Sequence, residues 1–158
     1  MHGRVVFPIH NAQGELVAYA GRWPGEPPEG EGKYKLPPGF HKVLDVYNLH
    51  RATACAPEHG LVLVEGYFDV LRLWQYGICH AVALMGSTLS EVQEAQLVEA
   101  VGSQGRITLL FDGDPSGRAC TQDALERLSR RVFVKAILLP DGMQPDHLHE
   151  EDIRAFCS

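Results

Sequence analysis

Acidic residues follow two hydrophobic runs of the sequence, at the point where each run stops. Residues 61–64 lead into Glu65, and residues 107–111 lead into Asp112 and Asp114. Carboxylate oxygens are the ligands that Mg²⁺ and Mn²⁺ prefer in proteins. Three carboxylates gathered in one place repel one another unless a cation neutralises them. The sequence therefore predicts a divalent-metal site, provided that the two runs are neighbours in the fold.

The elements that must bring these residues together are strands alternating with helices. We expect strands at residues 61–65, 80–85, 107–111 and 132–139, and helices at 67–76, after Ser90, and at 118–131. Short apolar runs of this kind, joined by helices, are typical of a buried parallel α/β sheet with right-handed crossovers. Ligands bind at the carboxyl ends of such strands, which is where the acidic residues stand.

Each acidic residue also has a simpler reading. Asp112 or Asp114 can cap the helix that follows, and Asp69 can complement a helix dipole. Glutamate is not a preferred capping residue, so Glu65 favours metal binding or general acid-base chemistry. Arg118 is expected near a helix start, where a cation is unfavourable. It therefore either reaches for a phosphate or pairs with Asp114.

The first forty residues have a different character. Residues 4–22 contain two β-rich runs joined by a polar turn at 11–14, which predicts a hairpin. Residues 24–32 are rich in Pro, Gly and Glu, and predict a surface loop. Residues 33–42 mix Lys with aromatic side chains. This mixture suits phosphate binding and base stacking, although a plain surface loop has the same composition.

Composition and charge set broad limits. The chain has 158 residues and a net charge of -6, and the entire excess of acidic residues lies beyond residue 60. No apolar stretch is long enough to span a bilayer and the first residues do not resemble a signal peptide, so a cytoplasmic protein is expected. The four cysteines are widely spaced, which argues against a structural zinc site and against a disulfide framework.

Residues 65–70, 81–88 and 111–118 resemble the TOPRIM domain, and specifically its version in bacterial DnaG-type primases. Topoisomerases and some nucleases share that domain, but the amino-terminal segment narrows the choice. Residues 4–9, 21–22, 33–34 and 40–42 resemble the small basic subdomain that precedes TOPRIM in these primases. The resemblance implies a Rossmann-like, mainly parallel α/β fold, with a partial basic subdomain at 1–58 and the TOPRIM domain at 59–158.

The resemblance also implies roles for single residues. Catalytic Mg²⁺ or Mn²⁺ would be held by Glu65, Asp112 and Asp114, with Asp69 in support. The basic residues that contact template or nucleotide would be Arg22, Lys33 and Lys42, and Arg118 is a further candidate. The last acidic motif of the family is Asp-Pro-Asp. Here it reads Gln144-Pro145-Asp146, so Asp146 carries over as a metal ligand and its partner does not.

The implied function is that of a DNA primase, a nucleotidyltransferase that makes short RNA primers on single-stranded DNA from NTPs. Family primases also carry a zinc-binding domain and a helicase-interacting domain. Neither pattern occurs in this sequence, so the expectation is an excised core or a truncated relative, weakly active alone, without zinc or a membrane partner. Two alternatives remain: a TOPRIM-type metal-dependent nuclease, and a degenerate TOPRIM nucleic-acid-binding module, which Gln144 would suit.

Overall fold

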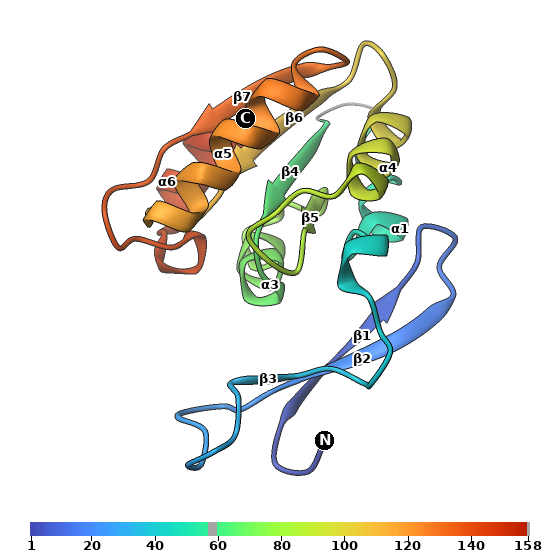
Figure 1. Cartoon of the computed structure of the whole chain (residues 1–158). Coiled ribbons are helices and arrows are strands. Elements are labelled where there is room, and N and C mark those ends of the chain that lie inside the picture. Colours follow the sequence, from blue (N-terminus) through green and yellow to red (C-terminus); the bar gives the residue numbers. More distant parts are fainter. Residues whose placement is uncertain (57–59, 158) are drawn as a thin grey trace.

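The protein, described here by a computed structural model for residues 1–56 and 60–157, contains two β-sheets (Figure 1). An antiparallel sheet has the order β1-β2-β3, with strands β1 (Val5–His10), β2 (Leu16–Arg22) and β3 (Tyr34–Lys35). A parallel sheet has the order β5-β4-β6-β7, with strands β4 (Leu61–Val64), β5 (Ala81–Ala83), β6 (Arg106–Leu110) and β7 (Phe133–Ile137). The predicted hairpin and parallel α/β sheet are therefore confirmed. The predicted domain boundary between residues 58 and 59 lies outside the described residues.

Three helices connect the described parallel strands, namely α3 (Tyr67–Gln75), α4 (Glu91–Val101) and α5 (Pro115–Leu128). Helix α1 (Leu49–Ala52) precedes β4 and α6 (Glu150–Cys157) follows β7, and the chain also forms short 3₁₀ turns η1 (Lys42–Leu44) and η2 (Pro145–His147). The start of α4 is set by Ser90, whose Oγ accepts a hydrogen bond from the Gln93 amide at 3.0 Å. Helix α5 begins earlier than predicted because Pro115 suits a first helical turn. In the described part of the chain, no helix has the length and apolarity to cross a membrane.

The parallel sheet is buried on both faces, as the strand β4 shows. Val62 and Val64 belong to one core cluster, which includes hairpin residues such as Phe7. Leu61 and Leu63 belong to the cluster on the other face, with residues of α4 and α5. Alternate side chains of a strand point to opposite faces, so one strand joins both halves of the core. The amino-terminal hairpin thus shares a core with the parallel sheet, and Phe7 of the hairpin stacks on Tyr67 of α3 with 5.0 Å between the ring centroids.

Helix α3 is rotated relative to the sequence prediction. The spacing of apolar residues in 67–76 favours a buried face of Val70, Leu71 and Trp74, but in the structure Leu71 is 44% exposed and Trp74 is 49% exposed. The buried side chains include Tyr67, Val70 and Leu73. Six of the nine residues of α3 are apolar or aromatic, so its apolar face is wide and hydrophobic periodicity alone does not define which part of that face turns inward.

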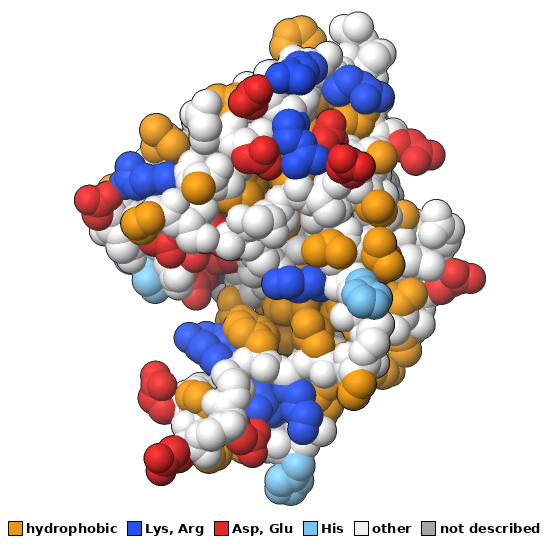
Figure 2. All heavy atoms as spheres, viewed as in Figure 1, with side chains coloured by type: hydrophobic (Ala, Val, Ile, Leu, Met, Phe, Trp, Pro, Cys, Tyr) orange, Lys and Arg blue, Asp and Glu red, His pale blue; other side chains and the backbone are white. Residues whose placement is uncertain are grey.

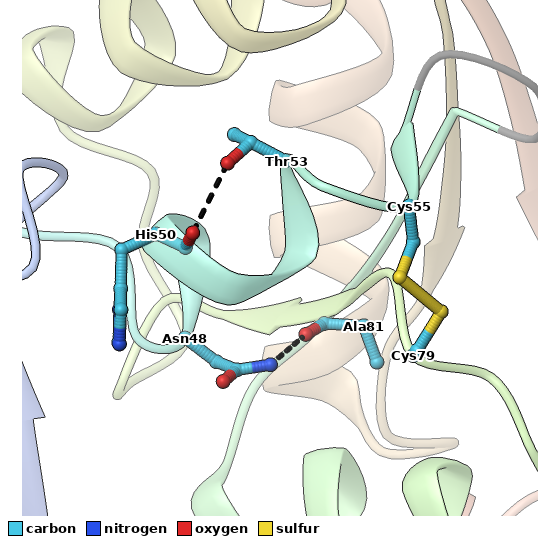
Figure 3. The surroundings of a disulfide bond; sticks show 6 residues. All are labelled: Asn48, His50, Thr53, Cys55, Cys79 and Ala81. Carbon is cyan, nitrogen blue, oxygen red and sulfur yellow. Dashed lines mark hydrogen bonds between the residues drawn. A yellow bond between two sulfur atoms is a disulfide. The ribbon is translucent and has the colours of Figure 1, made fainter.

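A disulfide joins Cys55, which follows α1, to Cys79, which precedes β5 (Figure 3). The sequence argued against disulfides, and for this pair that prediction was wrong. The spacing of 24 residues forms no recognisable motif. The two cysteines meet because the chain near α1 lies along β5, where the Asn48 side chain donates a hydrogen bond to the Ala81 carbonyl at 2.9 Å.

Reduction of this disulfide is expected to lower the free energy of unfolding by about 3 kcal/mol, because the crosslink closes a loop that is a few tens of residues long in the unfolded chain. Thermal unfolding with and without a phosphine reductant measures the effect. The Cys55→Ser variant is the control, and its melting temperature should not respond to reductant. An unchanged melting temperature of the reduced wild-type chain would contradict the prediction.

Candidate active site

The two acidic stretches meet at one edge of the parallel sheet. Strands β4 and β6 are hydrogen-bonded neighbours, with Leu63 paired to Leu109. Glu65 follows β4 and Asp112 follows β6, and Glu65 Oε1 accepts a hydrogen bond from the Asp112 backbone amide at 3.1 Å. The condition on which the predicted site depended, that these two strands lie side by side, is therefore met.

A cleft of about 390 Å³ lies between this sheet edge and the antiparallel sheet. Figure 2 shows the molecule hollowed between its two parts, with hydrophobic side chains in the hollow and Lys and Arg side chains at its rim. The carboxylates come from the segments that follow β4, β6 and β7 and from the first turn of α3, and they belong to Glu65, Asp69, Asp112 and Asp146. The amino-terminal segment supplies the cations of Arg22, Lys33 and Lys42. Cations and carboxylates thus come from opposite parts of the chain.

The carboxylates differ in what they already bind. Asp69 Oδ2 accepts a hydrogen bond from the Gly66 amide at 2.9 Å at the start of α3, which fits its reading as a helix-end residue. Asp114 Oδ1 accepts one from the Gly117 amide at 2.7 Å and caps α5. Asp114 is absent from the described lining of the cleft. Its capping role, which the sequence left open, is therefore the one that the geometry supports directly.

Burial and mutual repulsion raise the pKa values of the acidic cluster. Burial, followed by the charge of Asp112, raises the pKa of Glu65 to about 7. The same two causes raise the pKa of Asp69 to about 7. The pKa of Asp112 is also raised, by burial and then by the charge of Asp114. A cluster that resists ionisation in this way gains from a bound cation.

The donor set fits a hard divalent cation. Asp146 Oδ1 is buried and accepts no hydrogen bond from any described residue, although it lies 3.6 Å from His147 Nε2. Carboxylate oxygens of this kind suit Mg²⁺ or Mn²⁺, which retain several water ligands. Within residues 1–56 and 60–157, no three or more His, Cys, Asp or Glu side chains are already arranged as a complete metal-binding group. The carboxylates would therefore have to move closer around an ion, or hold it partly through water.

We predict that the neutral variant Glu65→Gln is more stable than the wild type at pH 8 in the absence of metal. The folded pKa of about 7 lies above the ordinary value of 4.5, so folded Glu65 keeps a proton that the unfolded chain has released. Its contribution to stability is therefore lost as pH rises between these two values. The advantage of the variant should grow from pH 4.5 to pH 7 in thermal unfolding with EDTA.

The matched control for that pH dependence is Glu99→Gln, which removes an exposed carboxylate of α4. Its melting temperature should follow that of the wild type at every pH. A Glu65→Gln variant that gives no advantage at pH 8 would show that Glu65 is not penalised in the folded chain.

The cations of the cleft are held in different ways. The Arg22 guanidinium lies 4.0 Å from the centroid of the Phe68 ring and 5.7 Å from that of Tyr34. The Lys42 ammonium approaches Gly86, in the turn after β5, so closely that a Cβ there would be 2.6 Å from Nζ. Arg118 instead forms an ion pair with Asp141, and neither residue belongs to the described lining of the cleft, so Arg118 pairs with Asp141 where the sequence offered Asp114. A role of Arg118 in phosphate binding stays a prediction.

Several residues that line the cleft were given no contact or site role by the sequence analysis. The side chain of Gln144 donates a hydrogen bond to Asp112 Oδ2 at 2.9 Å. Tyr67, Phe68 and Met85 also line the cleft, and Met85 has a φ of 61°, which is uncommon for a residue other than glycine. The sequence could have indicated Phe68, because this residue adjoins Asp69. The contact between Gln144 and Asp112 joins distant segments, so only the tertiary structure reveals it.

The chain matches a known protein family and several curated proteins. Residues 62–149 match the family described as Toprim-like. The DNA primase of Pseudomonas aeruginosa is 36% identical over 150 residues, which cover 92% of this chain and 22% of that protein. The chain thus spans about a quarter of the length of such relatives.

Solved structures give the same result. The Aquifex aeolicus primase structure, with zinc-binding and RNA polymerase domains, matches with a TM-score of 0.84 and 33% identity, covering 98% of this chain and 40% of that one. A DnaG primase catalytic domain bound to single-stranded DNA matches with a TM-score of 0.80 and 32% identity, covering 97% of this chain and 50% of that one. With 33% and 32% identity, this chain resembles both proteins in amino-acid sequence as well as in fold.

Proposed function

The chain belongs to the Toprim-like family, and we propose that it forms the metal-dependent catalytic core of a DnaG-type DNA primase. In the proposed reaction, the 3′-hydroxyl of a growing RNA strand attacks the α-phosphate of an incoming ribonucleoside triphosphate. A new phosphodiester bond forms, the bond between the α- and β-phosphates breaks, and pyrophosphate leaves. A single-stranded DNA template selects the nucleotide.

The observation that carries this proposal is the division of charge across the cleft. Four carboxylates face three cations within one space of about 390 Å³. A polyanionic substrate would bind the basic side through Arg22, Lys33 and Lys42. Its reacting phosphate would then lie towards the acidic side. The aromatic rings of Tyr34 and Phe68, which flank Arg22, offer surfaces for base stacking.

We assign the metal to Glu65, Asp112 and Asp146, with Asp69 in support and Asp114 acting through its charge and its cap on α5. Bound Mg²⁺ or Mn²⁺ would neutralise and orient the transferring phosphoryl group. Glu65 and Asp69 would ionise fully only when a cation offsets their raised pKa values. The choice between the two metals is left to experiment.

The partners follow from the reaction. We propose single-stranded DNA and NTPs as substrates, and a cytoplasmic site of action. A replicative helicase would be reached through segments that the longer relatives possess. We expect such segments to help position the template, so the activity of this chain alone should be weak.

The test is incubation with single-stranded DNA, labelled NTPs and Mn²⁺, followed by gel analysis of both nucleic acids. Labelled oligoribonucleotides with intact DNA would support the primase. Shortened DNA without RNA products would instead identify a nuclease. DNA binding that needs no metal and survives Asp112→Asn, without either product, would identify a binding module.

A further inference from the structure

A neutral side chain is inserted into the acidic cluster. Gln144 Nε2 donates a hydrogen bond to Asp112 Oδ2 at 2.9 Å, and both residues line the cleft. An amide N–H that points at a carboxylate oxygen satisfies that oxygen without adding charge. One of the two oxygens of Asp112 is therefore engaged by the protein itself.

The backbone around Gln144 is fixed to the acidic loop. The Gly113 amide donates to the Met143 carbonyl, and the Gly142 amide donates to the Gly113 carbonyl, both at 2.8 Å. Gln144 is also the residue before η2, and its amide donates to His147 Nδ1 at 3.3 Å. Pro145, the next residue, is buried. The two cross-loop hydrogen bonds join Gly113, which follows Asp112, to the residues just before Gln144, and they hold the two loops together beside the contact between Gln144 and Asp112.

The other carboxylates are engaged in the same one-sided manner. Glu65 accepts the Asp112 amide through Oε1, and Asp69 accepts the Gly66 amide through Oδ2. Each of these three carboxylates thus has one oxygen held by a hydrogen-bond donor of the protein. The remaining oxygens, with the buried Oδ1 of Asp146, are enough for one hydrated divalent ion, which typically takes one or two carboxylates and several waters.

We propose that Gln144 is a positioning residue that holds Asp112 in a single orientation and limits the acidic cluster to one divalent cation. This inference rests on the proposed metal site. A carboxylate at position 144 would add a negative charge beside Asp112 and release Asp112 Oδ2 from its donor. Two cations could then share Asp112 between them.

Calorimetric titration with Mn²⁺, in the absence of nucleotide and DNA, tests the proposal, with electron paramagnetic resonance to count bound ions. The wild type should bind one Mn²⁺ per chain. Gln144→Asp should bind two, an increase that a merely structural role would not produce. Gln144→Asn, which is neutral but one methylene shorter, should still bind one, with an affinity about tenfold weaker or more. Gln13→Asp adds the same charge in the exposed hairpin turn and should match the wild type.

Failure of the inference is distinct from failure of the metal site. If Asp112→Asn loses Mn²⁺ while all Gln144 variants bind like the wild type, the metal site stands and the role of Gln144 is overturned. Two Mn²⁺ ions in the wild type overturn it as well. If the wild type binds no Mn²⁺, or Asp112→Asn binds it equally well, the metal site and the inference fail together.

Discussion

Asp112→Asn is expected to lower the rate of primer synthesis by about 10²–10³-fold, the usual cost of removing one fixed electrostatic group from an active site. Asp112 stands at the centre of the cluster: its amide binds Glu65, and its carboxylate accepts from Gln144. Asparagine has the same shape and can still accept the Gln144 hydrogen bond. The change therefore removes charge while leaving the local packing intact. Mn²⁺ affinity should fall together with the rate.

The matched control is Asp123→Asn. Asp123 lies on α5 and pairs with Arg127, and its side chain is 53% exposed. Its loss should change the rate less than twofold, because exposed ion pairs contribute little and it lies outside the described cleft. An Asp112→Asn variant that synthesises primers at the wild-type rate would remove Asp112 from the chemistry, whatever its effect on stability.

The sequence was sufficient for the sheet and for the position of the acidic residues. Strands β4 (Leu61–Val64) and β6 (Arg106–Leu110) are short, mainly apolar runs between turn residues, and that signal is local. To predict that Glu65 and Asp112 lie close together, one must also know that β4 and β6 are neighbours in the sheet. Hydrophobic periodicity does not give the order of strands, and the structure shows it.

The sequence was insufficient wherever a contact joins distant segments. The Cys55–Cys79 disulfide and the hydrogen bond from Gln144 to Asp112 both arise from packing, and neither has a spacing that predicts it. The roles of Arg22, Lys33 and Lys42 came from resemblance. The structure places all three at the cleft, which leaves those roles as proposals with a consistent location.

Asp114 shows a different limit. Metal binding and helix capping both place an acidic residue between a strand and a helix, so the two readings share one sequence pattern. The geometry separates them through Gly117, whose amide donates to Asp114 Oδ1. Gly117 itself was not identified from the sequence, because the requirement for glycine comes from atoms of other segments.

Gly117→Ala is the second prediction with a large expected effect, a loss of about 10²-fold in the rate of primer synthesis. A Cβ at this position would overlap the Asp112 backbone carbonyl and lie 2.8 Å from Glu65 Oε1. Either α5 or the acidic loop must move to make room. A displacement of about 1 Å in an active site is enough for a rate loss of this size. Mn²⁺ affinity should also fall, since both affected residues belong to the acidic cluster.

Ser116→Ala is the control, because Ser116 is the preceding residue of the same helical turn and is exposed. It should retain the wild-type rate and Mn²⁺ affinity. The assay is run well below the melting temperature of each variant. Any loss of rate then comes from a displaced active site in a folded chain and not from unfolding. Alanine favours a helix interior over glycine by about 1 kcal/mol, which offsets part of the cost of the overlap. If Gly117→Ala keeps both the wild-type rate and the wild-type affinity, the close packing of α5 against Asp112 is not what sets the geometry of the acidic cluster.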